Sequence, residues 1–165
     1  MNDRYLAIYL NDHRSGMVGA RELTRRSIDE NRDTALGEDL QAFLAELESD
    51  AATLEELMDR VGAERDTLKA AAGWAAEKIG RLKLNGRLAG YSELSRLEEL
   101  EILRLGVQGK LALWQLMRHV AAVDARLEGL DFEGLITRAE RQRDLLERHR
   151  LDAGRAALLP EQPVR

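Results

Sequence analysis

The stretch LGEDLQAFLAELESDAATLEELMDRVG, residues 36–62, indicates most clearly which fold this chain adopts. Its apolar residues recur every three or four positions, which is the spacing of one face of an α-helix. They are Leu40, Phe43, Leu47, Leu54, Leu57 and Val61. Gly62 follows directly, at the position where a residue in the left-handed conformation usually ends a helix. The stretch therefore predicts an amphipathic helix over about 36–61.

The same spacing continues in both directions along the chain, and no segment alternates polar and apolar residues as a half-buried strand does. Asp131 is a good N-cap, and Ser95 with Glu98 matches the capping-box pattern. Gly106 and Gly109 lie inside a helical pattern, where they mark either a kink or a place of close packing. We predict four further helices, over about 3–31, 64–84, 92–123 and 132–159.

The composition is that of one folded domain. The chain has 165 residues, of which 44% are hydrophobic and 4% aromatic, so aliphatic side chains must fill the core. No linker or repeat divides it, and both prolines lie in the last six residues. We therefore expect a helical domain over 1–159 and a disordered tail over 160–165. The order of long and short helices predicts an all-α, ferritin-like four-helix bundle in which helix 64–84 connects two antiparallel pairs.

Composition also limits the function. The net charge of −5 argues against nucleic-acid binding. The chain has no cysteine, which excludes disulfides and thiolate metal sites. No stretch approaches the ~20 apolar residues of a membrane span, and no secretory signal is evident, so we expect a cytoplasmic protein without a membrane partner. Familiar nucleotide-binding and hydrolase motifs are absent as well, which favours a non-enzymatic protein.

Two stretches carry a resemblance to known proteins. They are YLAIYLNDHRSGMVGARELTRR, residues 5–26, and GWAAEKIGRLKLNGRLAGYSELSRLEELE, residues 73–101. Both are similar to stretches in a small group of uncharacterised bacterial proteins of the ferritin-like superfamily. The resemblance implies the fold but no catalytic residues.

Metal-binding members of that superfamily hold two irons with Glu-x-x-His motifs, because residues i and i+3 project from one helix face toward the bundle axis. The residue three positions before each of His13, His119 and His149 is a leucine. Both Glu-x-x-His motifs are therefore missing, and the ordinary di-iron site is rejected.

Four residues remain as candidates for a different metal site. His13 and Asp50 each lie in phase with the apolar face of their predicted helix, and Glu98 and Glu101 border the apolar face of helix 92–123. A histidine with two or three carboxylates could hold Fe or Mn, as in a redox or storage protein. The alternative is a buried polar network without a cofactor, in which His13 and Asp50 bond each other or an arginine inside the bundle. In that network we expect Asp50 or Glu98 as the hydrogen-bond partner of His13. We favour the network.

Other charged residues have simpler interpretations. An acidic side of helix 36–61, with Glu48, Glu55 and Asp59, is expected to face solvent or to pair with arginines. A basic group around Asn85 and Gly86 either docks an anion or stabilises a helix end. Trp74 and Trp114 are expected in the core or at a subunit interface. We therefore expect a protein that acts by association, most simply as a homo-oligomer, with any small ligand unknown.

Overall fold

A computed structural model describes residues 2–66 and 91–159 of the chain. These residues form four long helices and one turn of 3₁₀-helix, η1, and contain no strand. The elements are α1 (Asp3–Glu30), α2 (Ala35–Val61), α4 (Glu93–Ala121), η1 (Ala125–Leu127) and α5 (Phe132–Leu158). The all-α prediction is confirmed. The predicted helix over 64–84 lies almost wholly outside the described residues, as does the tail 160–165, and the described residues 64–66 are not helical.

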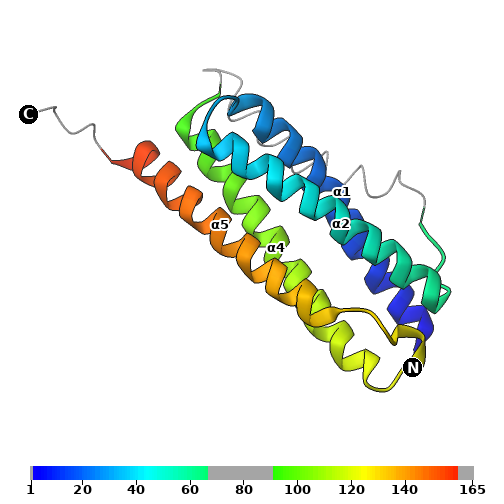
Figure 1. The fold of residues 1–165 in the computed structure, drawn as a ribbon. Coiled ribbons are helices and arrows are strands. Elements are labelled where there is room, and N and C mark those ends of the chain that lie inside the picture. The colour runs from blue at the N-terminus through cyan, green and yellow to red at the C-terminus, as the bar shows by residue number, and fades with distance from the viewer. Residues whose placement is uncertain (1, 67–90, 160–165) are drawn as a thin grey trace, which may run out of the picture.

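The four helices form one bundle (Figure 1). α1 packs against α2 and α4, and α5 packs against α4 and α2, so α1 lies diagonally across from α5 and α2 across from α4. α1 and α5 run in one direction along the bundle, whereas α2 and α4 run in the other. α2 therefore ends, and α4 begins, at opposite ends of the bundle, as the expected connection between two antiparallel pairs requires.

The helix ends are set by local hydrogen bonds. The side chains of Thr34 and Asp131 accept from the backbone N–H groups three residues later, at 3.1 and 2.9 Å. Gly62 ends α2 with φ 68°, a left-handed conformation that favours glycine. The expected capping box is wrong: Ser92 is the N-cap of α4 and accepts from the backbone of Ser95, which already lies in the first turn.

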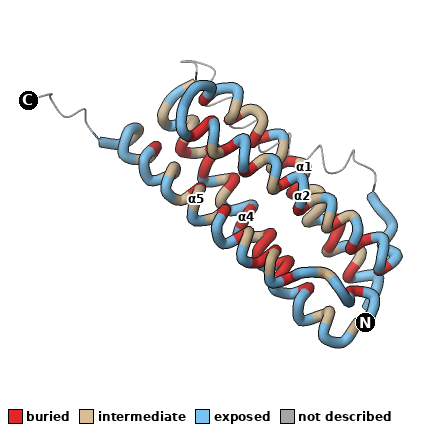
Figure 2. The backbone as a smooth tube through the Cα atoms, in the orientation of Figure 1, coloured by how far each residue is buried: buried red, intermediate tan, exposed pale blue. Residues whose placement is uncertain are grey.

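The buried residues lie on the facing sides of the four helices (Figure 2), and most of the core side chains are leucines. The largest fully buried side chain is Trp114, so this residue belongs to the core rather than to a subunit interface. Trp74, the other tryptophan, lies outside the described residues. Among the described helices, none is long and apolar enough to cross a membrane.

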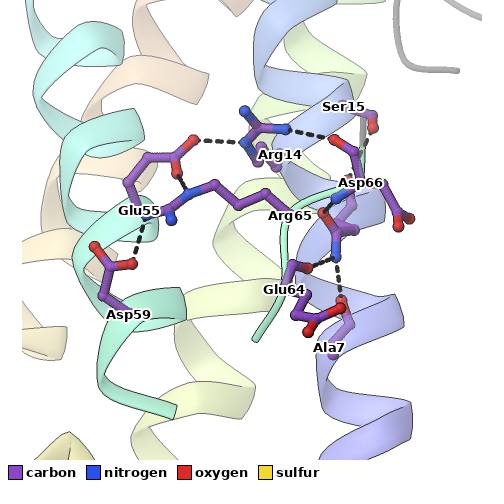
Figure 3. A network of polar contacts seen from close by, with 9 residues as sticks. Ala7, Arg14, Ser15, Glu55, Asp59, Glu64, Arg65 and Asp66 are labelled. Atoms are coloured by element: carbon purple, nitrogen blue, oxygen red, sulfur yellow. Dashed lines mark hydrogen bonds and ion pairs between the residues drawn. The ribbon is translucent and has the colours of Figure 1, made fainter. Parts of the chain in front are cut away.

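The acidic side of α2 is paired with arginines, as predicted. Arg14 of α1 donates to Glu55 at 2.6 Å, and Arg65, just beyond α2, bonds both Glu55 and Asp59 (Figure 3). The buried Asn11 side chain also accepts from the backbone N–H of Asp66 at 3.0 Å. These contacts attach the residues that follow α2 to both α1 and α2.

Candidate functional site

A buried polar group crosses the middle of the bundle. Asp50 of α2 and Lys110 of α4 are almost completely buried, and the Lys110 ammonium donates to the Asp50 carboxylate and to the side-chain oxygen of Gln142 on α5. Arg138 of α5 donates to the other Asp50 oxygen at 2.8 Å. Because α2 and α4 are diagonal neighbours, the long lysine side chain is what spans the interior between them.

The charges in this group are compensated. Burial lowers the pKa of Lys110, because desolvation disfavours the ammonium, and the Asp50 carboxylate opposes that shift. Gln142 extends this hydrogen-bond network to Glu46, to which it donates at 2.9 Å. A buried ion pair of this kind fixes which helix faces meet, because any other register would leave a charge without a partner in the core.

A cavity of about 390 Å³ lies next to this group, between α1 and α4. Four glycines, two from each of these helices, lie along its wall, and Lys110 is part of its lining. A Cβ atom added at Gly16, Gly106 or Gly109 would meet no atom of a described residue within 4 Å. The glycines of α4 therefore neither kink this continuous helix nor pack closely against another described residue; they leave room beside it.

His13 is the most distinctive side chain of the cavity wall. It is half-buried, and its ring meets the Tyr9 ring edge-on, with 4.6 Å between centroids. Burial lowers the pKa of His13, only partly opposed by the neighbouring Asp12 carboxylate, so the imidazole is neutral at pH 7. No hydrogen bond from its side chain is found within residues 2–66 and 91–159, which leaves one N–H donor and one acceptor beside the cavity.

The four candidate metal ligands are not brought together. Asp50 bonds Lys110 and Arg138 rather than His13, so the expected pairing of His13 with Asp50 is wrong. The expected alternative, an arginine partner for Asp50, is confirmed by Arg138. Glu98 is half-buried and forms no side-chain hydrogen bond with a described residue, whereas Glu101 is exposed and lies 3.4 Å from Arg150. In the part of the chain that the structure describes, no group of three His, Asp or Glu residues is arranged to hold a metal ion.

A second buried carboxylate belongs to Glu99, near the start of α4. One of its oxygens accepts from Ser27 at 2.6 Å and from the Tyr91 hydroxyl at 3.3 Å, and the other lies 3.2 Å from Arg26. Asn31 donates to the Tyr91 hydroxyl at 2.9 Å. Burial raises the pKa of Glu99, and the Ser27 hydrogen bond offsets part of that rise. Burial also raises the pKa of Tyr91 to about 12, so its hydroxyl stays protonated and can donate.

We expect the pH dependence of stability to report on Glu99. Because its pKa is higher in the folded than in the unfolded protein, its contribution is fully present below the unfolded value of 4.5 and is lost as pH rises through the folded value. Glu99→Gln should remove this component, about 1.4 kcal/mol for each unit of pKa shift. Urea unfolding from pH 4 to 8 measures it. Glu101→Gln, on the exposed side of α4, should keep the wild-type dependence of the free energy of unfolding on pH. If Glu99→Gln also kept that dependence, Glu99 would not be its source.

Sequence reasoning missed Lys110, Gln142 and Glu99. Lys110 lies in phase with Val107 and Trp114 on the core face of α4, so its spacing was a usable signal. Glu99 lies next to the buried Leu100 and differs from Glu98 by a single helical step, which the apolar pattern does not resolve. The basic group around Asn85 and Gly86 lies outside the described residues.

Comparison of the chain with protein-family models, with curated proteins and with solved structures finds no match. The cavity and the side chains around it are therefore the features that indicate a function.

Proposed function

We propose that this bundle is a non-enzymatic binding protein whose α1–α4 cavity takes a compact, uncharged and mainly apolar molecule with one hydrogen-bonding group. The observation that carries the proposal is the cavity of about 390 Å³ beside His13 and Lys110. Small-molecule sites in proteins usually measure about 300–1,000 Å³ and combine an apolar wall with a few polar groups.

The chemistry of the wall indicates the class of ligand. Met17, Leu23, Phe43, Leu47 and Val107 contribute apolar surface, and contact with it favours an apolar ligand body. The neutral His13 ring can donate to a carbonyl or accept from a hydroxyl. Asp12 also lines the cavity, and its carboxylate disfavours an anionic ligand. The Lys110 ammonium is already engaged by Asp50 and Gln142, so it needs no anion from the ligand.

The proposal is tested with prodan, a neutral naphthyl ketone whose emission shifts to the blue in apolar surroundings. We expect saturable binding at one site per chain. Gly106→Leu and Gly16→Leu should each weaken it about tenfold or more, because their side chains enter open space in the cavity and remove the volume that the probe needs. His13→Phe keeps the ring but loses both polar atoms, so a smaller loss of about threefold is expected.

Gln108→Leu is the matched control, because it adds the same side chain to an exposed position of α4 outside the cavity. It should bind prodan as the wild type does. A wild-type protein that causes no blue shift would contradict the proposal. Equal affinities of Gly106→Leu, Gly16→Leu and the wild type would move the binding site away from this cavity.

We also propose that the chain belongs to the ferritin-like superfamily. It is supported by the directions of the four helices and by the single connection between α2 and α4 along the bundle, because ferritin-like bundles have one such crossover. A cytoplasmic location and self-association remain part of the proposed function, and the acidic net charge supports the absence of a nucleic-acid partner.

A further inference from the structure

The outer face of α4 carries an exposed apolar stripe. Leu94, Leu105 and Leu116 are 49%, 66% and 46% exposed, whereas α2 has no large apolar side chain of comparable exposure. The three leucines are spaced by 11 residues, which is close to three helical turns, so they share one side of the helix. That side is opposite to Val107 and Trp114, which face the core.

Small residues separate the leucines of this stripe. Gly109 and Ala112 lie between Leu105 and Leu116 on the same side of α4, and a Cβ atom at Gly109 would meet no atom within 4 Å in residues 2–66 and 91–159. Small side chains beside large ones let a second helix approach closely and receive its leucines in the spaces between. Singly exposed leucines need no explanation, but a row of them along one helix marks an interaction surface.

We propose that the stripe binds a second copy of this chain, with the two α4 helices antiparallel about a twofold axis. In a twofold dimer the same surface serves both copies, so a pairing of residue i with residue j also pairs j with i. Placing Leu105 opposite Ala112 of the second copy sets a large side chain over a small one. The same register brings Glu98 opposite His119 of the second copy.

Two polar residues of the stripe complement one another in this antiparallel arrangement, because a histidine N–H can donate to a carboxylate. Glu98 precedes the apolar centre of the stripe, and His119 follows it. Neither forms an ion pair or a side-chain hydrogen bond with a described residue, so both can engage a second molecule. A parallel pair of α4 helices would instead set Glu98 against Glu98, which is unfavourable. The occupant that best matches both the sizes and the charges is therefore the chain itself.

The dimer does not depend on the ligand proposed above, and its test avoids the cavity. Leu105 also lines the cavity, so the variants are made at Leu116 and Leu94, which do not. Light scattering at micromolar concentration should give twice the 18.6 kDa mass of one chain. Leu116→Glu or Leu94→Glu should weaken the dimer about thirtyfold or more, because each places a charge on the apolar stripe. Both variants should keep the wild-type affinity for prodan.

Leu151→Glu is the matched control, because Leu151 is 45% exposed but lies on α5. It should leave the dimer intact. Glu98→Lys should weaken the dimer about fivefold, and adding His119→Glu should restore it, because a Lys–Glu ion pair then replaces the contact between Glu98 and His119. A monomeric wild type at micromolar concentration overturns the proposal. The α4 interface is overturned if Leu151→Glu has as large an effect as Leu116→Glu. It is also overturned if adding His119→Glu to Glu98→Lys does not restore the dimer.

Discussion

Asp50→Ala is expected to lower the free energy of unfolding by about 3–5 kcal/mol, because it removes one partner of a buried ion pair and leaves the other without a counter-charge. Lys110 is 3% exposed and has only Asp50 and Gln142 as described hydrogen-bond partners. After the substitution its ammonium must keep its charge in the core with one neutral acceptor or lose its proton. Arg138 is better placed, since 30% of its side chain is exposed to water.

Two further variants separate the ion pair from the simple loss of a side chain. Asp50→Leu combined with Lys110→Met replaces both charges by apolar groups of similar size and should cost less than Asp50→Ala alone. Glu46→Ala, at a half-exposed position of the same network, should change the free energy of unfolding by less than about 1 kcal/mol. Urea unfolding at pH 7 measures all three. A loss of under 1 kcal/mol for Asp50→Ala would mean that water reaches Lys110.

The fold could be predicted from the sequence because the residues that start, continue and end a helix are close together in the chain. Leu40, Phe43 and Leu47 repeat at the helical period, and Gly62 and Asp131 mark helix ends by their own backbone and side-chain chemistry. The sequence left the start of α4 open between Ser92 and Ser95, because both are equally good N-caps. Only Ser92 has the extended backbone that a cap requires.

The candidate site could be predicted only in part. Asp50 was placed correctly on the inner side of α2, since its phase with Leu47 and Leu54 is a local property. Its partner was not predictable in the same way, because the choice among His13, Glu98 and Lys110 depends on how far α4 is rotated and shifted against α2. Helical periodicity does not contain that information. The cavity was not predictable for the same reason, since its volume depends on the distance between α1 and α4 at four glycines.

Leu146→Ala is expected to cost about 2–5 kcal/mol, the sum of the lost transfer free energy and of the space left unfilled. The apolar phase of α5 predicts that Leu146 faces the core, and the structure confirms this: the side chain is completely buried, on the same face as Leu135 and Ala153. The neighbouring Leu145 is only half-buried. The interior position matters more than the leucine itself, because only a packed site leaves a cavity when the side chain is shortened.

Leu151→Ala provides the comparison on the same helix. Leu151 is 45% exposed, so shortening it removes little buried surface and opens no cavity, and its expected change is within about 0.5 kcal/mol. The two variants have the same helix propensity change, and therefore their difference isolates the contribution of burial. Thermal and urea unfolding should agree on the order. If Leu151→Ala cost as much as Leu146→Ala, the outer side of α5 would have to be covered as well, and α5 rather than α4 would be the helix that meets a second copy.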